Sequence, residues 1–161
     1  RLIINCFILI LVVNINYYNH HLLLTLSLIS LILDGIDGYL SRFLRQYTYF
    51  GETFDQEVDN FLIFILSFSL VYNYSCSILI MCVPIYRYMF LALVKYGYIS
   101  NENLPRSVFR KAICVLMTIT LILCNYLYTF DSIIDLLYVI IILLTYSFIK
   151  DTIWLYRRNS V

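Results

Sequence analysis

Long apolar runs separated by short polar connections are the feature that most constrains the fold of this chain. Of its 161 residues, 62% are hydrophobic and 13% are charged, and the mean hydropathy is +0.85. A soluble domain of this length carries about twice that share of charged residues. One soluble core cannot bury so much apolar surface, so lipid must cover the remainder. We therefore expect an all-α, polytopic membrane protein.

Six apolar segments predict six transmembrane helices. They cover residues 2–14, 22–41, 55–74, 77–97, 109–128 and 132–150. The first segment is shorter than the roughly 20 residues that a span needs. It follows Arg1 rather than a methionine, so we interpret it as a truncated first helix. A signal peptide is the alternative, but no small-residue cleavage site follows the run. The absence of internal repeats and linkers predicts a single membrane domain over residues 1–161.

Basic residues gather at one set of helix ends, which predicts the orientation. The connections near residues 15–21, 73–77 and 129–132 contain no Lys or Arg. The basic residues at the other ends are Arg1, Arg42, Arg45, Lys95, Arg106, Arg110, Lys111, Lys150, Arg157 and Arg158. Because Lys and Arg are biased toward the cytoplasm, we expect both termini on the cytosolic side. The net charge of +1 gives no indication of a nucleic acid partner.

Four aspartates lie at the predicted cytosolic ends of two apolar segments. Asp34 and Asp37 are three residues apart, and Asp55 and Asp59 are four apart, so each pair occupies one helix face. If the two helices pack side by side, four carboxylates converge just inside the membrane boundary. Such like charges repel unless a cation compensates them. Hard cations such as Mg²⁺ prefer oxygen ligands, and two ions can share four carboxylates and clamp a diphosphate.

Simpler interpretations exist for the aspartates taken one at a time. Asp55 can cap the third helix, where a carboxylate favours the positive end of the helix dipole. The stretch DGIDG can form a turn, and its acidic spacing departs from that of a calcium-binding loop. An uncompensated cluster of four acids at this depth is costly, so the set as a whole favours a metal site.

Two glycines and an arginine extend this candidate site. Gly38 lies one turn beyond Asp34, and Gly51 lies one turn before Asp55. The missing side chains let a flat or bulky ligand approach the backbone on the carboxylate face. Arg42 follows Gly38 by one turn and can hold a phosphate. Together these residues predict a site for a nucleotide diphosphate.

The arrangement of these residues resembles the signature of the CDP-alcohol phosphatidyltransferase family. The matching pattern is Asp34-x-x-Asp37-Gly38-x-x-Ser41-Arg42, eight residues, and Gly51-x-x-x-Asp55-x-x-x-Asp59. Every fixed spacing agrees, and the one departure is Ser41, where the family usually has alanine. The chain is most similar to a little-defined bacterial branch that reads FDxEVD at this point. Asn60 stands where phosphatidylglycerophosphate synthases have a lysine.

The resemblance implies a six-helix enzyme of the bacterial inner membrane, usually a homodimer, with its active site facing the cytoplasm. Such an enzyme would transfer the phosphatidyl group from CDP-diacylglycerol to a polar alcohol and release CMP. Glycerol 3-phosphate is slightly favoured as acceptor over serine or inositol phosphate.

The resemblance also implies a role for each matching residue. The ligands of two Mg²⁺ or Mn²⁺ ions would be Asp34, Asp37, Asp55 and Asp59. The residues lining the CDP pocket would be Gly38, Arg42 and Gly51. Asp59 would also be the general base for the acceptor hydroxyl. A carboxylate beside metal ions is a weak base, but it need accept the proton only as the bond to phosphorus develops.

Further basic residues are candidates for binding the substrates. Arg87 lies well inside the fourth predicted span, on a helix that Pro84 is expected to kink. A charge at that depth is costly and usually functional, so we interpret Arg87 as a substrate-binding residue. Arg106, Arg110 and Lys111 can anchor the fifth span to anionic lipid headgroups. Alternatively they bind the acceptor phosphate, as in the family members that use glycerol phosphate or inositol phosphate.

Other polar residues receive structural interpretations. Glu57 is two residues from Asp55 and so faces elsewhere on the helix. His20 and His21 fall in an outer connection and are expected to be surface residues at the membrane interface.

Three alternative functions use the same features. Transfer of a phosphoalcohol from a CDP-alcohol to diacylglycerol would employ the same aspartates. A divalent-cation transporter needs acids deeper in the spans, whereas only Asp131 and Asp135 lie near the outer face. A non-catalytic membrane scaffold is the third alternative, and the complete set of four aspartates argues against it.

Overall fold

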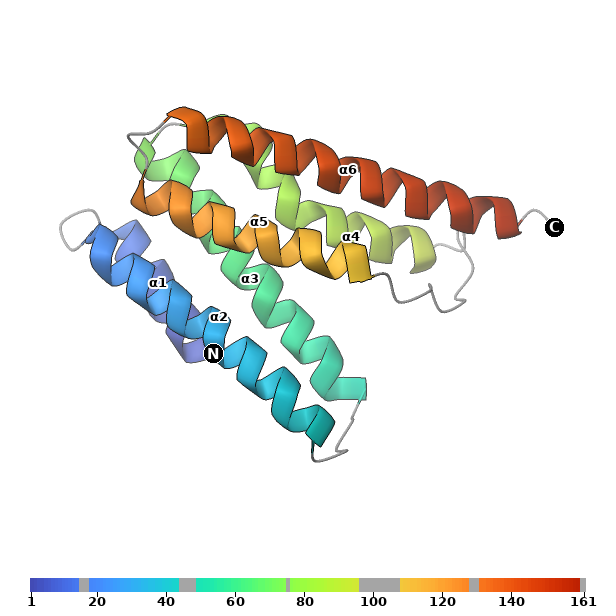
Figure 1. Cartoon of the computed structure of the whole chain (residues 1–161), viewed down its shortest axis with the longest axis horizontal. Helices are drawn as coiled ribbons and strands as arrows, with labels where there is room; N and C mark the ends of the chain where they lie inside the picture. Colours follow the sequence, from blue (N-terminus) through green and yellow to red (C-terminus); the bar gives the residue numbers. More distant parts are fainter. Residues whose placement is uncertain (15–17, 44–48, 75, 96–107, 128–130, 160–161) are drawn as a thin grey trace.

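The computed structural model describes residues 1–14, 18–43, 49–74, 76–95, 108–127 and 131–159 (Figure 1). Within these ranges the chain forms six α-helices, one short 3-10 helix and no strand. The helices are α1 (Leu2–Val13), α2 (His20–Phe43), α3 (Tyr49–Tyr74), η2 (Ile78–Met81, 3-10), α4 (Cys82–Lys95), α5 (Val108–Tyr126) and α6 (Asp131–Asn159). The all-α prediction is confirmed, and each predicted apolar segment corresponds to one α-helix.

Two helices extend beyond the apolar segments that predicted them. α3 already begins at Tyr49 rather than at residue 55, so that Gly51 and Asp55 both lie inside it. α6 continues to Asn159, past the apolar segment that ends at residue 150. Hydropathy marks the part of a helix that suits lipid, whereas polar residues can continue the same backbone hydrogen bonding beyond it.

The fourth predicted helix is divided into two parts. Ser77 caps η2 by accepting a hydrogen bond from the backbone N–H of Leu79, and α4 begins at Cys82. Pro84 is therefore in the first turn of α4, where its missing N–H breaks no helical hydrogen bond. The irregularity that we expected at Pro84 lies just before it, at the junction of the 3-10 and α-helical segments.

α3 is the central helix of the molecule. It packs against α1, α4, α5 and η2, while α2 packs against α1 and α5, and α6 packs against α4 and α5. Its C-terminal half supplies Leu62, Ile65, Leu66 and Leu70 to the buried core. Figure 1 shows that the C-terminal end of α2 and the N-terminal end of α3 diverge from the ends of α4 and α5. The aspartates of the candidate site lie on these diverging ends.

The outward faces of the helices are strongly apolar. Large exposed side chains include Ile3, Ile10, Ile32, Phe50, Ile78 and Ile142. Among the described residues, the segment His20–Leu40 of α2 is the one helix both long and apolar enough to cross a membrane by itself, and only 17% of an 18-residue window within it is buried. The core helix of a soluble protein would be mostly buried. These faces suit a lipid environment, and the six-span topology stays a prediction.

Candidate active site

Four carboxylates from two helices surround one guanidinium group. Arg1, the N-cap of α1, has its Nη1 atom 2.7 Å from Oδ1 of Asp34 and 2.6 Å from Oδ1 of Asp59. Its Nη2 atom is 2.8 Å from Oδ1 of Asp55, and its Nε atom is 3.5 Å from Oδ2 of Asp37. The two pairs of aspartates therefore converge on one point. Among the described residues, α2 and α3 are brought together here by their common packing against α1, and not by packing side by side as the prediction assumed. The position of Arg1 at this point was not predicted from the sequence.

The guanidinium is buried on the inner side of the cluster. The Arg1 side chain is 6% exposed, whereas the four aspartate side chains are between 39% and 55% exposed. Burial by itself lowers the pKa of Arg1, but the negative charges of Asp59, Asp34 and Asp55 raise that pKa above its ordinary value. Arg1 therefore remains charged. One positive group facing four carboxylates leaves the cluster attractive to further cations.

The donor atoms fit a hard divalent cation in type. All four side chains offer carboxylate oxygens, the ligands that Mg²⁺ and Mn²⁺ prefer. In their present positions the oxygens are arranged around the nitrogens of a guanidinium, at 2.6–3.5 Å. Among the described residues, no three His, Cys, Asp or Glu side chains are grouped as ligands of a single ion. An Mg²⁺ ion lies about 2.0–2.1 Å from each of its oxygen ligands. With the guanidinium of Arg1 between them, the carboxylate oxygens are too far apart for that geometry.

A buried polar contact lies one helical turn below the cluster. Asn5 is fully buried, and its Nδ2 atom donates to the carbonyl oxygen of Val58 on α3 at 3.1 Å. Ser30 Oγ on α2 donates to Oδ1 of Asn5 at 2.8 Å. Asn5 thereby connects all three helices that position the site, and it shares a helix face with Arg1. The sequence signal for this contact is an asparagine four residues after an arginine within an apolar run, and it was not used in the prediction.

The neighbours of the aspartates on α3 face other helices. Asn60 is buried, and its Nδ2 atom donates to the carbonyl oxygen of Pro84 at 3.2 Å. Glu57 accepts a hydrogen bond from the hydroxyl group of Tyr88 at 2.9 Å. Both contacts lead to α4, so Glu57 faces away from the cluster, as predicted. Asn60 therefore joins α3 to α4. The lysine that phosphatidylglycerophosphate synthases have at this position would have to be buried here.

The remaining predicted site residues are described less completely. Gly38 and Gly51 are half-buried in α2 and α3, on the same helices as the aspartates. The backbones of Arg42, Arg87 and Arg110 lie in α2, α4 and α5, and their side chains lie outside the described part of the chain. Arg106 lies outside it entirely. The roles of these residues therefore stay predictions.

A second polar cluster lies at the opposite end of α2. The hydroxyl group of Tyr74 is 2.8 Å from Nδ1 of His20 and donates to the carbonyl oxygen of Asn125 at 2.9 Å. Tyr18 and Tyr74 are joined by their hydroxyl groups at 3.1 Å. His20 and His21 are exposed, as predicted, but they begin α2 instead of lying in a loop. His20 helps to connect α2, α3 and α5, about 21 Å along α2 from Asp34.

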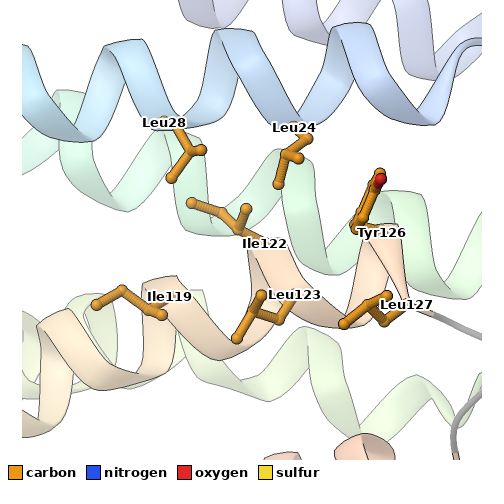
Figure 2. Close-up of a pocket in the computed structure, with 7 residues that line it drawn as sticks. All are labelled: Leu24, Leu28, Ile119, Ile122, Leu123, Tyr126 and Leu127. Carbon is orange, nitrogen blue, oxygen red and sulfur yellow. The ribbon is translucent and has the colours of Figure 1, made fainter.

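An apolar pocket of about 300 Å³ lies between α2 and α5. It is lined by Leu24, Leu28, Ile119, Ile122, Leu123, Tyr126 and Leu127. Figure 2 shows Leu24 and Leu28 of α2 opposite the side chains of α5. The lining contains no acidic or basic group, so the pocket offers no chemistry of its own.

Comparison with protein families identifies the class to which this site belongs. The profile described as CDP-alcohol phosphatidyltransferase matches residues 1–130, which include helices α1 to α5 and all four aspartates. The chain belongs to the CDP-alcohol phosphatidyltransferase family. Comparison with curated proteins and with solved structures gave no match.

Membership of the family defines the general reaction. Its members are integral membrane enzymes of phospholipid biosynthesis that transfer a phosphatidyl or phosphoalcohol group from a CDP-alcohol to an alcohol acceptor. They are phosphotransferases for substituted phosphate groups. The resemblance inferred from the aspartate signature is thus confirmed.

Proposed function

We propose that this protein transfers the phosphatidyl group from CDP-diacylglycerol to a polar alcohol, with glycerol 3-phosphate slightly favoured as the acceptor and CMP as the other product. The observation that carries the proposal is the convergence of Asp34, Asp37, Asp55 and Asp59 on one cationic group, in a chain of this family. Four converging carboxylates can hold divalent ions, and such ions would bind the negatively charged diphosphate of the donor.

In the proposed mechanism, the four aspartates would hold two Mg²⁺ or Mn²⁺ ions, and these ions would supply positive charge to neutralise the diphosphate and departing CMP. Asp59 accepts the proton of the acceptor hydroxyl. The acceptor oxygen forms a bond to the phosphorus of the phosphatidyl group, and the bond from that phosphorus to the CMP oxygen breaks. CMP leaves with the electron pair of that bond. Positioning of the reactants and electrostatic stabilisation together contribute most of the rate enhancement in such transfers.

The other predicted site residues would position the two substrates. Gly38 and Gly51 would let the CDP moiety approach the backbones of α2 and α3. Arg42 would pair with a phosphate of the donor. The residues proposed to hold the acceptor phosphate are Arg87, Arg106 and Arg110, since guanidinium groups match phosphate geometry.

We further propose a single membrane domain over residues 1–161, with six spans and the aspartates near the cytoplasmic face of a bacterial inner membrane. The apolar outward faces of the helices support lipid contact, and the distribution of basic residues supports this orientation. A homodimer is the expected assembly.

The decisive experiment measures CMP release in membranes from cells that express the protein. CDP-diacylglycerol and Mg²⁺ or Mn²⁺ are supplied, with and without each candidate alcohol. Release that depends on one alcohol, on the metal ion and on Asp59 would establish the reaction and identify the acceptor. Asp135→Asn is the matched control, because Asp135 is an exposed acid of α6 remote from the cluster.

If no alcohol supports CMP release, the membranes are next supplied with soluble CDP-alcohols and diacylglycerol. Turnover under these conditions would assign transfer of a phosphoalcohol in place of transfer of a phosphatidyl group. Failure of both assays would leave the non-catalytic scaffold as the better description.

A further inference from the structure

The position of Arg1 within the aspartate cluster has no role in the proposed reaction. One of its nitrogens, Nη1, contacts carboxylates of two different helices, Asp34 of α2 and Asp59 of α3. Its other amino nitrogen, Nη2, contacts Asp55. The side chain is almost completely buried by these contacts, so it is not a solvated surface charge that happens to lie nearby.

The guanidinium engages the same oxygens that the proposed ions would require. Oδ1 of Asp34, Oδ1 of Asp55 and Oδ1 of Asp59 each accept a hydrogen bond from it at 2.6–2.8 Å. A divalent ion approaches such oxygens to about 2.0–2.1 Å. A guanidinium among those ligands would then lie within a few ångströms of the ion and be repelled by it. The two cations therefore exclude each other from the centre of the cluster.

We propose that Arg1 is an internal counter-ion of the aspartate cluster, which divalent ions must displace in order to bind. The inference rests on the proposed metal site and adds a residue that the family signature in this chain does not contain. In the absence of ions, Arg1 compensates the carboxylates and holds the site-bearing ends of α2 and α3 beside α1. When ions bind, its side chain leaves the centre of the cluster. Arg1 thus sets how tightly the site binds metal.

The first test measures the affinity of the purified full-length protein for Mn²⁺ without any nucleotide. Arg1→Gln should bind Mn²⁺ about tenfold or more tightly than the unmodified protein, because a competing charge has been removed. Arg1→Lys should lie between them, since one ammonium group cannot contact all four carboxylates at once. Lys150→Gln removes an exposed positive charge of α6 and should leave the affinity unchanged.

A second test uses the unmodified protein and so does not depend on the folding of a variant. Phenylglyoxal modifies accessible arginine side chains, and mass spectrometry of the peptide containing Arg1 reports the extent of modification. Mn²⁺ should increase the modification of Arg1 several-fold, because the displaced guanidinium becomes accessible. Free arginine added to the reaction provides the reference for the activity of the reagent.

The outcomes separate this inference from the proposed function. If the unmodified protein binds Mn²⁺ and Arg1→Gln binds it equally or more weakly, Arg1 does not compete with the ion and the inference is overturned while the metal site stands. Unchanged modification of Arg1 on addition of Mn²⁺ overturns it as well. If neither protein binds Mn²⁺, the proposed metal site fails, and the inference fails with it.

Discussion

Three consecutive residues of α3 have three different partners. Val58 offers its carbonyl oxygen to Asn5 of α1, Asp59 contacts the guanidinium of Arg1, and Asn60 donates to the carbonyl oxygen of Pro84. Successive side chains on a helix point about 100° apart, which explains why the side chains of Asp59 and Asn60 reach the cluster and α4, whereas Val58 contributes only its backbone carbonyl. Substitutions at adjacent positions should therefore affect different properties of the protein.

The first prediction concerns Asp59. Asp59→Asn keeps the size of the side chain but removes the negative charge and the ability to accept a proton. We expect CMP release to fall about 10²–10⁴-fold, the usual contribution of a general base. The measurement is CMP release per folded protein in detergent. A variant that retains full activity would show that another group accepts the proton.

The second prediction concerns the buried contact below the cluster. Asn5→Leu removes the hydrogen bonds to Val58 and from Ser30, so the free energy of unfolding should fall by about 1–2 kcal/mol. Thermal unfolding in detergent measures the change. Asn14→Leu is the matched control at the C-cap of the same helix, because the Asn14 side chain is exposed and its Nδ2 atom donates to the carbonyl oxygen of Ile10 in α1. Equal effects at the two positions would contradict the positioning role of Asn5.

At the scale of the element, α3 divides into two functional halves. Its N-terminal half carries Asp55 and Asp59 on exposed turns, and its C-terminal half is the centre of the apolar core. Contacts with α1, α4 and α5 hold the core half in place. The site half is therefore positioned by a rigid extension of the same helix, which keeps the carboxylates at defined distances from those of α2.

The third prediction separates these halves. Leu66→Ala removes a side chain with 0% exposure and should lower the free energy of unfolding by about 2–5 kcal/mol. Phe64→Ala, two residues away and 37% exposed, should cost clearly less, because its ring already faces outward. Chemical or thermal unfolding in detergent distinguishes them. The folded fraction of both variants should keep its metal affinity, and a loss of that affinity would show that the two halves are coupled.

Hydropathy predicted the six helices, because each apolar run is long enough to favour a helix. The three- and four-residue spacings predicted that the aspartates of each pair share one helix face. The early start of α3 and the division between η2 and α4 escaped prediction because neither changes the hydropathy of the segment. The contacts of Arg1 and Asn5 escaped for a different reason. They join residues between 25 and 58 positions apart, and no periodicity in one helix specifies its partner on another.

At the scale of the whole molecule, charge and polarity are separated along the helix axes. One end carries the aspartates and Arg1, and the other carries the cluster of His20, Tyr18 and Tyr74. Between the two ends the outward faces are apolar. This arrangement is typical of a protein that presents two polar ends on opposite sides of a lipid layer.

The fourth prediction tests this orientation. Single cysteines are introduced at Asn19 and at Lys150, both exposed, in a protein whose five native cysteines have been replaced by serine. A membrane-impermeant maleimide should label Asn19→Cys only in right-side-out vesicles and Lys150→Cys only in inverted ones. Labelling of both positions from the same side would contradict the six-span topology. CMP release by the cysteine-free protein confirms that it is folded.

The buried guanidinium also bears on how the protein is made. Many metal centres are assembled only when the ion arrives, because their ligands repel one another until it binds. Here Arg1 at the start of α1 supplies a positive charge to the acids of α2 and α3. Helices α1 to α3 can therefore insert and pack as they leave the ribosome, before any ion is available. Under the proposed counter-ion role of Arg1, metal would load as a late step, and newly made protein would already be folded when it binds.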